Sequence, residues 1–436
     1  MGDHGSRRQS RIHRGAPGLK VTRLELFYDL VFVFALLNVT VLLSETLTGP
    51  SLLGGFVVLA LLWWCWTGFA VVGNNVRADQ GIIPLVSLVT TAAVFVLALT
   101  IPEAFHDEPG GLPGPFVFAS CYFVVRGLQV LVLGWVVGAE VGWVRRLLLA
   151  VPALISTVLI LAAALLPLRE LEEPAESGAR LGLWAIALLV EYGVGMVLRT
   201  IGGNVVSAGH WAERHALIVL VALGESIISL GTGPGPSLRS GLPITWPIIL
   251  AAVSGITVIS GLWWAYFDSL ALAVEQRLHR VHGLARITLA RDAYTYLHLP
   301  MIAGIIMFAL GLKRILVEVA DPKVSGWRDT VDRMDVFVLY AGVIIYQLAL
   351  LGLSLRAFRT IRVAPTGAAT VLILLIPLAV RVPAIVALGM LTLIILILMV
   401  VQVWRSSPSR HRIREEALGE QIALEVEETK WRRRHR

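Results

Sequence analysis

Long apolar stretches separated by short polar segments fill the chain almost from end to end. Most stretches reach the roughly 20 residues that an α-helix needs to cross a hydrocarbon core of about 30 Å. The pattern predicts an all-α fold, a polytopic helical transmembrane bundle of about twelve spans. The predicted spans are 24–44, 51–72, 82–101, 115–138, 147–168, 181–201, 211–231, 244–267, 294–312, 336–355, 367–380 and 382–404.

The composition and the distribution of charge agree with this prediction. Hydrophobic residues make up 56% of the chain and charged residues 15%, whereas soluble domains carry about 25% charged residues. Lys and Arg fall mainly on alternate loops and near both ends, and basic residues in short loops stay on the cytoplasmic side. Both termini are therefore expected in the cytoplasm. The net charge of +7 reflects this topology, so a bilayer and not a nucleic acid is the expected partner.

The chain shows signs of an internal repeat. Residues 25–36 resemble residues 213–223, and the Leu-Trp-Trp run at 62–64 recurs at 262–264. Such pairs keep their order along the chain, which predicts two six-span halves related by an axis along the membrane normal. The predicted halves are residues 24–201 and 202–404, between a basic N-terminus, 1–23, and a C-terminal tail, 405–436. Chance similarity among apolar helices is the alternative.

Four charged residues lie deep inside predicted spans, where each costs at least about 2.5 to 3.5 kcal/mol on insertion scales. They are Asp29, Arg126, Glu191 and Glu225. Arg126 lies near the middle of its span and needs a carboxylate partner, for which Glu191 or Glu225 is the natural candidate. These charges are expected to form either a functional pathway or a structural network that ties the two halves together.

Two further groups of polar residues accompany these charges. Glu25 and Asp29 are four positions apart, so they share one face of the first span, with Asn38 farther along. Their mutual repulsion is expected to be relieved by a nearby Arg or Lys. In the seventh span, Glu225 follows Glu213 by about 18 Å along a helix, which places titratable groups at two depths.

Aromatic residues have a simpler explanation. Trp63, Trp64 and Trp66 fall near the cytoplasmic end of the second span, where they are expected to form an interfacial belt or to line a cavity. Tyr294 and Tyr296 are expected to be interfacial anchors, and His298 a satisfied polar group. The two cysteines both lie in spans, and no phosphate loop, catalytic triad or metal-ligand cluster stands out. No cofactor or metal is therefore expected.

Several of these segments together resemble the bacterial low temperature requirement A family of multi-pass membrane proteins. The resemblance extends over roughly residues 21–404. The segments that carry it are residues 25–34, 63–66, 213–226, 262–268 and 298–304. It implies a bacterial inner-membrane location and a link to growth in the cold, and it implies no particular substrate.

The leading hypothesis is a transporter or channel-like protein for a small solute or ion, because ionisable residues at depth mark such pathways. No residue is assigned a catalytic role, and oligomer formation is left open. The candidate pathway residues are Glu25, Asp29, Asn38, Arg126, Glu191, Glu213, Arg214, Glu225, Ser226, Asp268 and His298.

Two alternatives remain. One is an intramembrane enzyme that acts on a lipid or isoprenoid with a buried carboxylate as general acid. Diphosphate chemistry normally needs paired acidic motifs around Mg²⁺, and only Asn75 and Asp79 offer part of one. The other is a cold-adaptation scaffold whose tail, 410–436, forms an amphipathic helix on the bilayer surface.

Overall fold

The computed structural model describes residues 20–45, 47–105, 110–137, 143–165, 175–197, 205–232, 244–321, 323, 327–330 and 332–404, with residues 415 and 419. Helices account for nearly all of these residues, and no β-strand occurs among them. The helices are α1 Arg23–Glu45, α2 Gly49–Asn75, α3 Ile83–Leu99, α4 Gly114–Val137, α5 Trp143–Leu165, α6 Ala175–Val197, α7 Ala208–Thr232, α9 Trp246–Phe267, α10 Leu270–Arg280, α11 Gly283–Leu289, a π-helix Ala290–Tyr296, α12 Leu297–Val319, α13 Arg333–Phe358, α14 Val363–Ala379 and a last helix Ala384–Trp404.

Eight helical segments of the described chain are long and apolar enough to cross a membrane. Three more apolar helices, within α3, α5 and α14, are shorter. Each of the twelve segments predicted from the sequence overlaps a helix, and the ninth falls largely on α12. The all-helical fold of the described chain is therefore confirmed, with eight candidate membrane spans, while the count of twelve spans stays a prediction. Apart from residues 415 and 419, the predicted amphipathic tail helix lies outside the described residues, as does most of the basic N-terminus.

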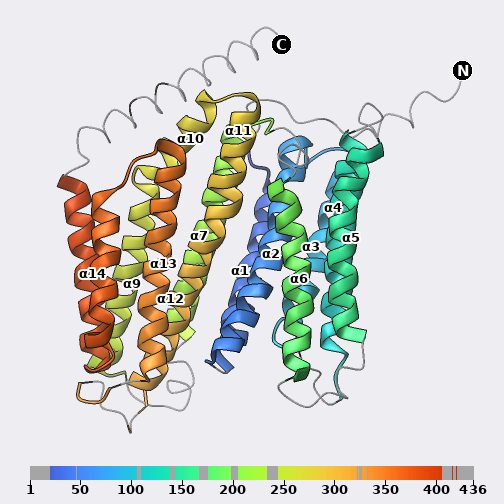
Figure 1. Cartoon of the computed structure of the whole chain (residues 1–436). Coiled ribbons are helices and arrows are strands. Elements are labelled where there is room, and N and C mark those ends of the chain that lie inside the picture. Colours follow the sequence, from blue (N-terminus) through green and yellow to red (C-terminus); the bar gives the residue numbers. More distant parts are fainter. Residues whose placement is uncertain are drawn as a thin grey trace, which may run out of the picture.

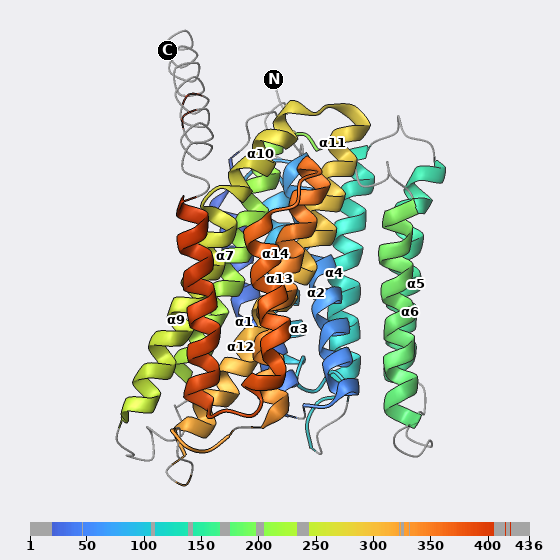
Figure 2. The ribbon, with the colours of Figure 1, turned by 60° about the vertical axis from the view of Figure 1, so that its left-hand side comes forward.

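The helices form a bundle of roughly aligned rods (Figure 1). The first six helices occupy one side, α7 and the later helices occupy the other, and α10 with α11 lies across one end. In the second view α5 and α6 form one edge of the molecule (Figure 2). The two sides meet where α1 packs against α7 and α12.

Local sequence signals explain where several helices begin and end. Thr48 precedes α2, and its hydroxyl accepts a hydrogen bond from the Ser51 amide while a proline occupies the first turn. Asp332 caps α13 in the same way by accepting from the Met334 amide at 2.8 Å. Arg359 ends α13 in a left-handed conformation, with φ of 56°.

Small residues allow α12 and α13 to approach closely. A Cβ atom at Gly304 would lie 2.6 Å from the Gly342 carbonyl oxygen, and one at Gly311 would lie 2.6 Å from the Leu339 amide nitrogen. Such close backbone contact replaces the hydrophobic effect as a source of helix association within lipid. This pair forms the packed centre of the second side, and every residue of α12 from Met301 to Leu312 is buried.

The start of α12 departs from regular helix. A proline lacks an amide hydrogen, and its ring clashes with the carbonyl four residues earlier. Pro300 lies inside α12, and the wide π-turn Ala290–Tyr296 precedes it. The Ala293 carbonyl in this turn lies 3.0 Å from the ring Nδ1 of His298. The predicted ninth span, 294–312, therefore begins within a π-turn and not within an α-helix.

Candidate functional site

The helices α1 and α7 run side by side in a single register. Three side-chain contacts join residues that are all 185 positions apart. The pairs are Glu25 with His210, Asp29 with Arg214, and Thr40 with Glu225. A constant offset requires parallel helices whose amino ends lie together, and at 1.5 Å per residue the contacts extend over about 22 Å of α1. We call this row of contacts the α1–α7 seam.

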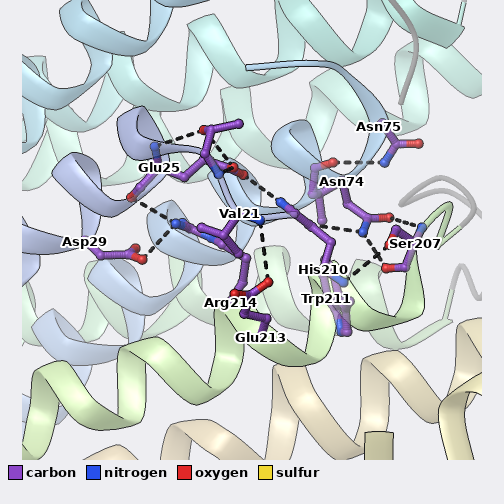
Figure 3. A network of polar contacts seen from close by, with 12 residues as sticks. Val21, Glu25, Asp29, Asn74, Asn75, Ser207, His210, Trp211, Glu213 and Arg214 are labelled. Carbon is purple, nitrogen blue, oxygen red and sulfur yellow. Dashed lines mark hydrogen bonds and ion pairs between the residues drawn. The ribbon is translucent and has the colours of Figure 1, made fainter. Parts of the chain in front are cut away.

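The first contact of the seam lies near the amino ends of both helices (Figure 3). His210 Nε2 lies 2.9 Å from Glu25 Oε1, and both side chains are buried. The other carboxylate oxygen accepts hydrogen bonds from the amide and the hydroxyl of Thr22, at 2.8 and 2.9 Å. A Cβ at Gly73 of α2 would lie 2.0 Å from Glu25 Oε1. Only glycine at that position leaves room for the carboxylate.

The second contact is a buried ion pair one helical turn farther along. Arg214 Nη1 donates to Asp29 Oδ2 at 2.7 Å and to the Glu25 carbonyl at 2.9 Å. The indole nitrogen of Trp66 donates to the other oxygen of Asp29 at 2.8 Å, and the guanidinium lies over the Trp66 ring at 5.4 Å. Nε and Nη2 of Arg214 have no hydrogen-bond partner within the described part of the chain. Asp29 is thus fully bound, whereas Arg214 uses one of its three nitrogens.

The carboxyl end of α2 is hydrogen-bonded to the segment that precedes α7. The side-chain oxygen of Asn74 accepts from the backbone amides of Val206 and Ser207, and its nitrogen donates to the Ser207 carbonyl at 2.7 Å. The same nitrogen lies 3.3 Å from His210 Nδ1 (Figure 3). Asn74 therefore fixes both the chain entering α7 and the imidazole that faces Glu25.

The third contact of the seam lies toward the opposite ends of α1 and α7. Glu225 Oε1 accepts hydrogen bonds from Thr40 at 2.8 Å and from Ser229 at 2.7 Å. The other oxygen, Oε2, is buried and has no hydrogen-bond partner among the described residues. Glu225 is therefore a fully buried carboxyl group with half of its hydrogen-bonding capacity unused.

A separate network lies within the first six helices, and we call it the Arg126–Glu191 network. Arg126 holds Glu191 with two parallel hydrogen bonds, from Nε at 3.1 Å and from Nη2 at 3.0 Å. Its third nitrogen donates to Gln129 at 2.6 Å. The Glu191 carboxylate also accepts from Trp64, Tyr122 and Ser156. Every nitrogen of this guanidinium has a partner, and four helices, α2, α4, α5 and α6, contribute to the network.

The α2 helix connects the two sets of contacts. Trp64 reaches Glu191 and Trp66 reaches Asp29, while the Cys65 carbonyl between them accepts from Gln129 at 2.6 Å. A Cβ at Gly68 would lie 2.2 Å from the Gln129 side-chain oxygen. The tryptophans of α2 therefore donate hydrogen bonds to both sets of contacts. Its glycines, Gly68 and Gly73, leave room for the side chains of Gln129 and Glu25.

An aromatic cluster surrounds His215, the residue that follows Arg214 in α7. The rings of Trp66, Trp211 and Tyr294 have centroids within 5.1 Å of the imidazole. Its Nδ1 lies 2.8 Å from the Trp211 carbonyl, an arrangement that leaves Nε2 as an acceptor. His298, on α12, is bound at both nitrogens, because Nε2 lies 2.9 Å from the Tyr266 hydroxyl.

The structure brings several of the predicted site residues together. Of the two partners expected for Arg126, Glu191 is the one that binds it. The Arg expected near Glu25 and Asp29 is Arg214. Asn38 and Ser226 donate to carbonyls of their own helices, those of Phe34 and Ala222.

The other predicted residues lie outside both networks or at their rim. Glu213 is exposed at the edge of the seam, 3.5 Å from the Val21 amide. Asp268 is buried at the carboxyl end of α9. His298 is a satisfied polar group, as predicted.

The interfacial explanation of the tryptophans was wrong for two of them. Trp63 and Trp66 are 3% and 0% exposed, and their indole nitrogens donate to Thr295 and Asp29 inside the protein. A tryptophan near a span end resembles a belt residue in sequence, but here the neighbouring helices α1 and α7 cover it. One sequence signal for the seam was missed: His210 and Arg214 repeat the four-residue spacing of Glu25 and Asp29.

The chemistry available at the seam is acid–base and electrostatic. The seam contains buried carboxylates, the imidazole of His210 and a guanidinium, and charge interactions are strong at buried sites. In the described chain, no group of three His, Cys, Asp or Glu side chains could hold a metal ion.

Comparison with known proteins places the chain in a family. Residues 20–400 match the family described as bacterial low temperature requirement A protein. The chain is 30% identical over 306 residues to the uncharacterized protein RA0937 of Rhizobium meliloti (strain 1021), a match that covers 66% of this chain and 67% of that protein. No solved structure matches. With nearly the whole helical bundle covered, including both buried networks, this chain belongs to the bacterial low temperature requirement A family.

Proposed function

We propose that the protein is a transporter or channel-like protein that moves a small solute or ion along the α1–α7 seam. The single observation that carries this proposal is the row of buried ionisable groups that two parallel helices hold at several depths. Glu25, Asp29 and Glu225 all belong to it, and each is at most 3% exposed. Ionisable side chains are expensive inside a bilayer, and they commonly mark ion or proton pathways.

The place of the seam in the bundle supports the same proposal. Secondary transporters commonly bind their substrates between structural repeats, and one repeat rocks against the other. We propose two six-span halves in parallel orientation, residues 24–201 and 202–404, which gives twelve spans. In that arrangement α1 and α7 are the first helices of the two halves, and the seam is the boundary that would open and close.

The proposed setting follows from charge and family. The protein is a multi-pass component of the bacterial plasma membrane with both termini in the cytoplasm, because basic residues favour that side. Its partners are the lipid bilayer and a small solute, an ion or a lipid. Self-association is compatible with the many apolar side chains on the outside of the bundle.

A flux measurement tests the proposal. The purified protein is reconstituted in liposomes, and proton and monovalent cation fluxes are measured across an imposed pH gradient. We expect flux from the wild type, little or none from Glu225→Gln, and wild-type flux from the control Glu45→Gln, whose side chain is exposed at the end of α1. Absence of proton and cation flux from the folded wild-type protein, or unchanged flux from Glu225→Gln, would overturn a proton or cation pathway through Glu225.

A further inference from the structure

We infer that the guanidinium of Arg214 is a binding point for the oxyanion of a carboxylate or phosphate group. This inference deepens the proposed function, on which it rests, by naming a chemical class of transported or regulatory ligand. The binding point is the edge of the guanidinium formed by Nε and Nη2. Both nitrogens lack a hydrogen-bond partner in the described structure, and the side chain is 0% exposed.

The chain itself shows how this edge binds an oxyanion. Arg126 uses its own Nε and Nη2 to hold the two oxygens of Glu191, at 3.1 and 3.0 Å. Such paired bonds match the fork of an arginine to the planar carboxylate or to phosphate oxygens. Within the described part of the chain, Arg214 directs only Nη1 to protein acceptors, Asp29 and the Glu25 carbonyl. Its paired edge therefore has no acceptor among the described residues, which leaves it available for the oxyanion of a ligand.

Leaving two charged donors buried and unused is costly, since an unpartnered buried donor costs about 1 to 3 kcal/mol and a charged one more. A ligand that supplies two oxygens removes that cost. Lysine would not serve equally, because it is a point charge without the paired geometry. Arg214 lies six residues from the first residue of α7, about 9 Å along the helix. An anion can reach it if the amino ends of α1 and α7 separate.

The neighbouring charges set the strength of this binding. The carboxylates of Asp29 and Glu25 repel an incoming anion. The imidazole of His210, beside Glu25, carries no negative charge and does not repel it. The oxyanion therefore competes with Asp29 for the guanidinium. Removing the charge of Asp29 should strengthen binding, which separates a ligand site from a salt bridge that serves only folding.

The test measures ligand-induced stabilisation of the full chain in nanodiscs of phosphatidylcholine, without any gradient. Acetate and inorganic phosphate are compared with chloride at constant ionic strength, since chloride carries the charge without the paired oxygens. We expect both oxyanions to raise the unfolding temperature of the wild type and chloride to leave it unchanged. Arg214→Lys should weaken the response by about tenfold in affinity, and Asp29→Asn should strengthen it. The control Arg77→Lys, at an exposed arginine, should respond as the wild type does.

A second arm distinguishes a soluble anion from a lipid headgroup. Stabilisation by phosphatidylglycerol nanodiscs that depends on Arg214 would assign the edge to a lipid phosphate, and a response to soluble oxyanions would assign it to a solute. Either result supports the inference. It is overturned if no oxyanion stabilises the folded wild type, or if the response is equal in Arg214→Lys and unaffected by Asp29→Asn. Binding without flux would refute transport alone, and flux without binding would refute this inference alone.

Discussion

Arg126 and Arg214 are both buried arginines paired with a carboxylate, yet the protein surrounds them differently. All three nitrogens of Arg126 are bound, and Glu191 accepts from three further donors. Arg214 is bound through one nitrogen only, as far as the described residues extend. The first pair lies among α2, α4, α5 and α6, and the second joins α1 to α7. The arginine pair within the first group of helices thus has complete polar contacts, and the pair at the boundary between the two groups has incomplete ones.

This difference suggests a division of roles. A fully satisfied buried network stiffens the packing around it, because any movement breaks several hydrogen bonds at once. An incompletely satisfied one can exchange partners at lower cost. We therefore expect changes in the Arg126–Glu191 network to reduce stability first, and changes in the seam to reduce flux first.

The largest effect is expected from removing Glu191. Glu191→Ala leaves Arg126 as a buried charge and deprives Trp64, Tyr122 and Ser156 of their acceptor. Breaking such a pair costs about 3 to 5 kcal/mol. Asp29→Ala should lower the free energy of unfolding by less, because Arg214 still donates to the Glu25 carbonyl and the Glu25 carboxylate stays nearby.

Reversible unfolding by sodium dodecyl sulfate in mixed micelles measures both losses. Glu45→Ala, at an exposed position, is the matched control. The comparison fails if Asp29→Ala destabilises the protein as much as Glu191→Ala does.

Two glycines of α2 allow a smaller and more selective disturbance. A Cβ at Gly68 would lie 2.2 Å from Gln129 Oε1 and 2.9 Å from Arg126 Nη1, whereas one at Gly73 would lie 2.0 Å from Glu25 Oε1. Overpacking of this kind costs about 1 to 3 kcal/mol. We expect Gly68→Ala to lower stability, and Gly73→Ala to lower flux with a smaller loss of stability, because Glu25 lies near a helix end.

The chain offers close controls for these glycines. Gly127 follows Arg126 and Gly224 precedes Glu225, and an added Cβ at either meets no atom within 4 Å. Alanine there should be neutral or stabilising by up to about 1 kcal/mol through helix propensity. Equal losses from Gly127→Ala and Gly68→Ala would show that helix packing in general, and not the polar network, sets the effect.

The sequence predicted the helices well because each is a long apolar run, and it predicted that buried charges would pair. Choosing Glu191 over Glu225 for Arg126 required the arrangement of α4 and α6, which hydropathy does not encode. The register of α1 and α7 was accessible in part, since Glu25 with Asp29 and His210 with Arg214 share one spacing. The unused edge of Arg214 was not accessible, because it depends on the direction of a side chain. The π-turn before Pro300 was missed because a proline in a span permits several local adjustments.

The smallest effect is expected from the tryptophans that donate to the two carboxylates. Trp64→Phe removes one donor from Glu191, which keeps Arg126, Tyr122 and Ser156. Trp66→Phe removes one from Asp29, whose remaining partner is Arg214.

Each substitution should cost about 1 kcal/mol in stability, since single hydrogen bonds contribute that much. Their effects on flux should differ, because Asp29 without Trp66 is held from one side only and can turn away from Arg214, whereas Glu191 without Trp64 stays fixed by its other partners. The exposed Trp246 provides the control Trp246→Phe. Equal flux from Trp64→Phe and Trp66→Phe would mean that the number of hydrogen bonds to a carboxylate does not determine whether it takes part in transport. The difference between the two arginine pairs would then affect folding alone.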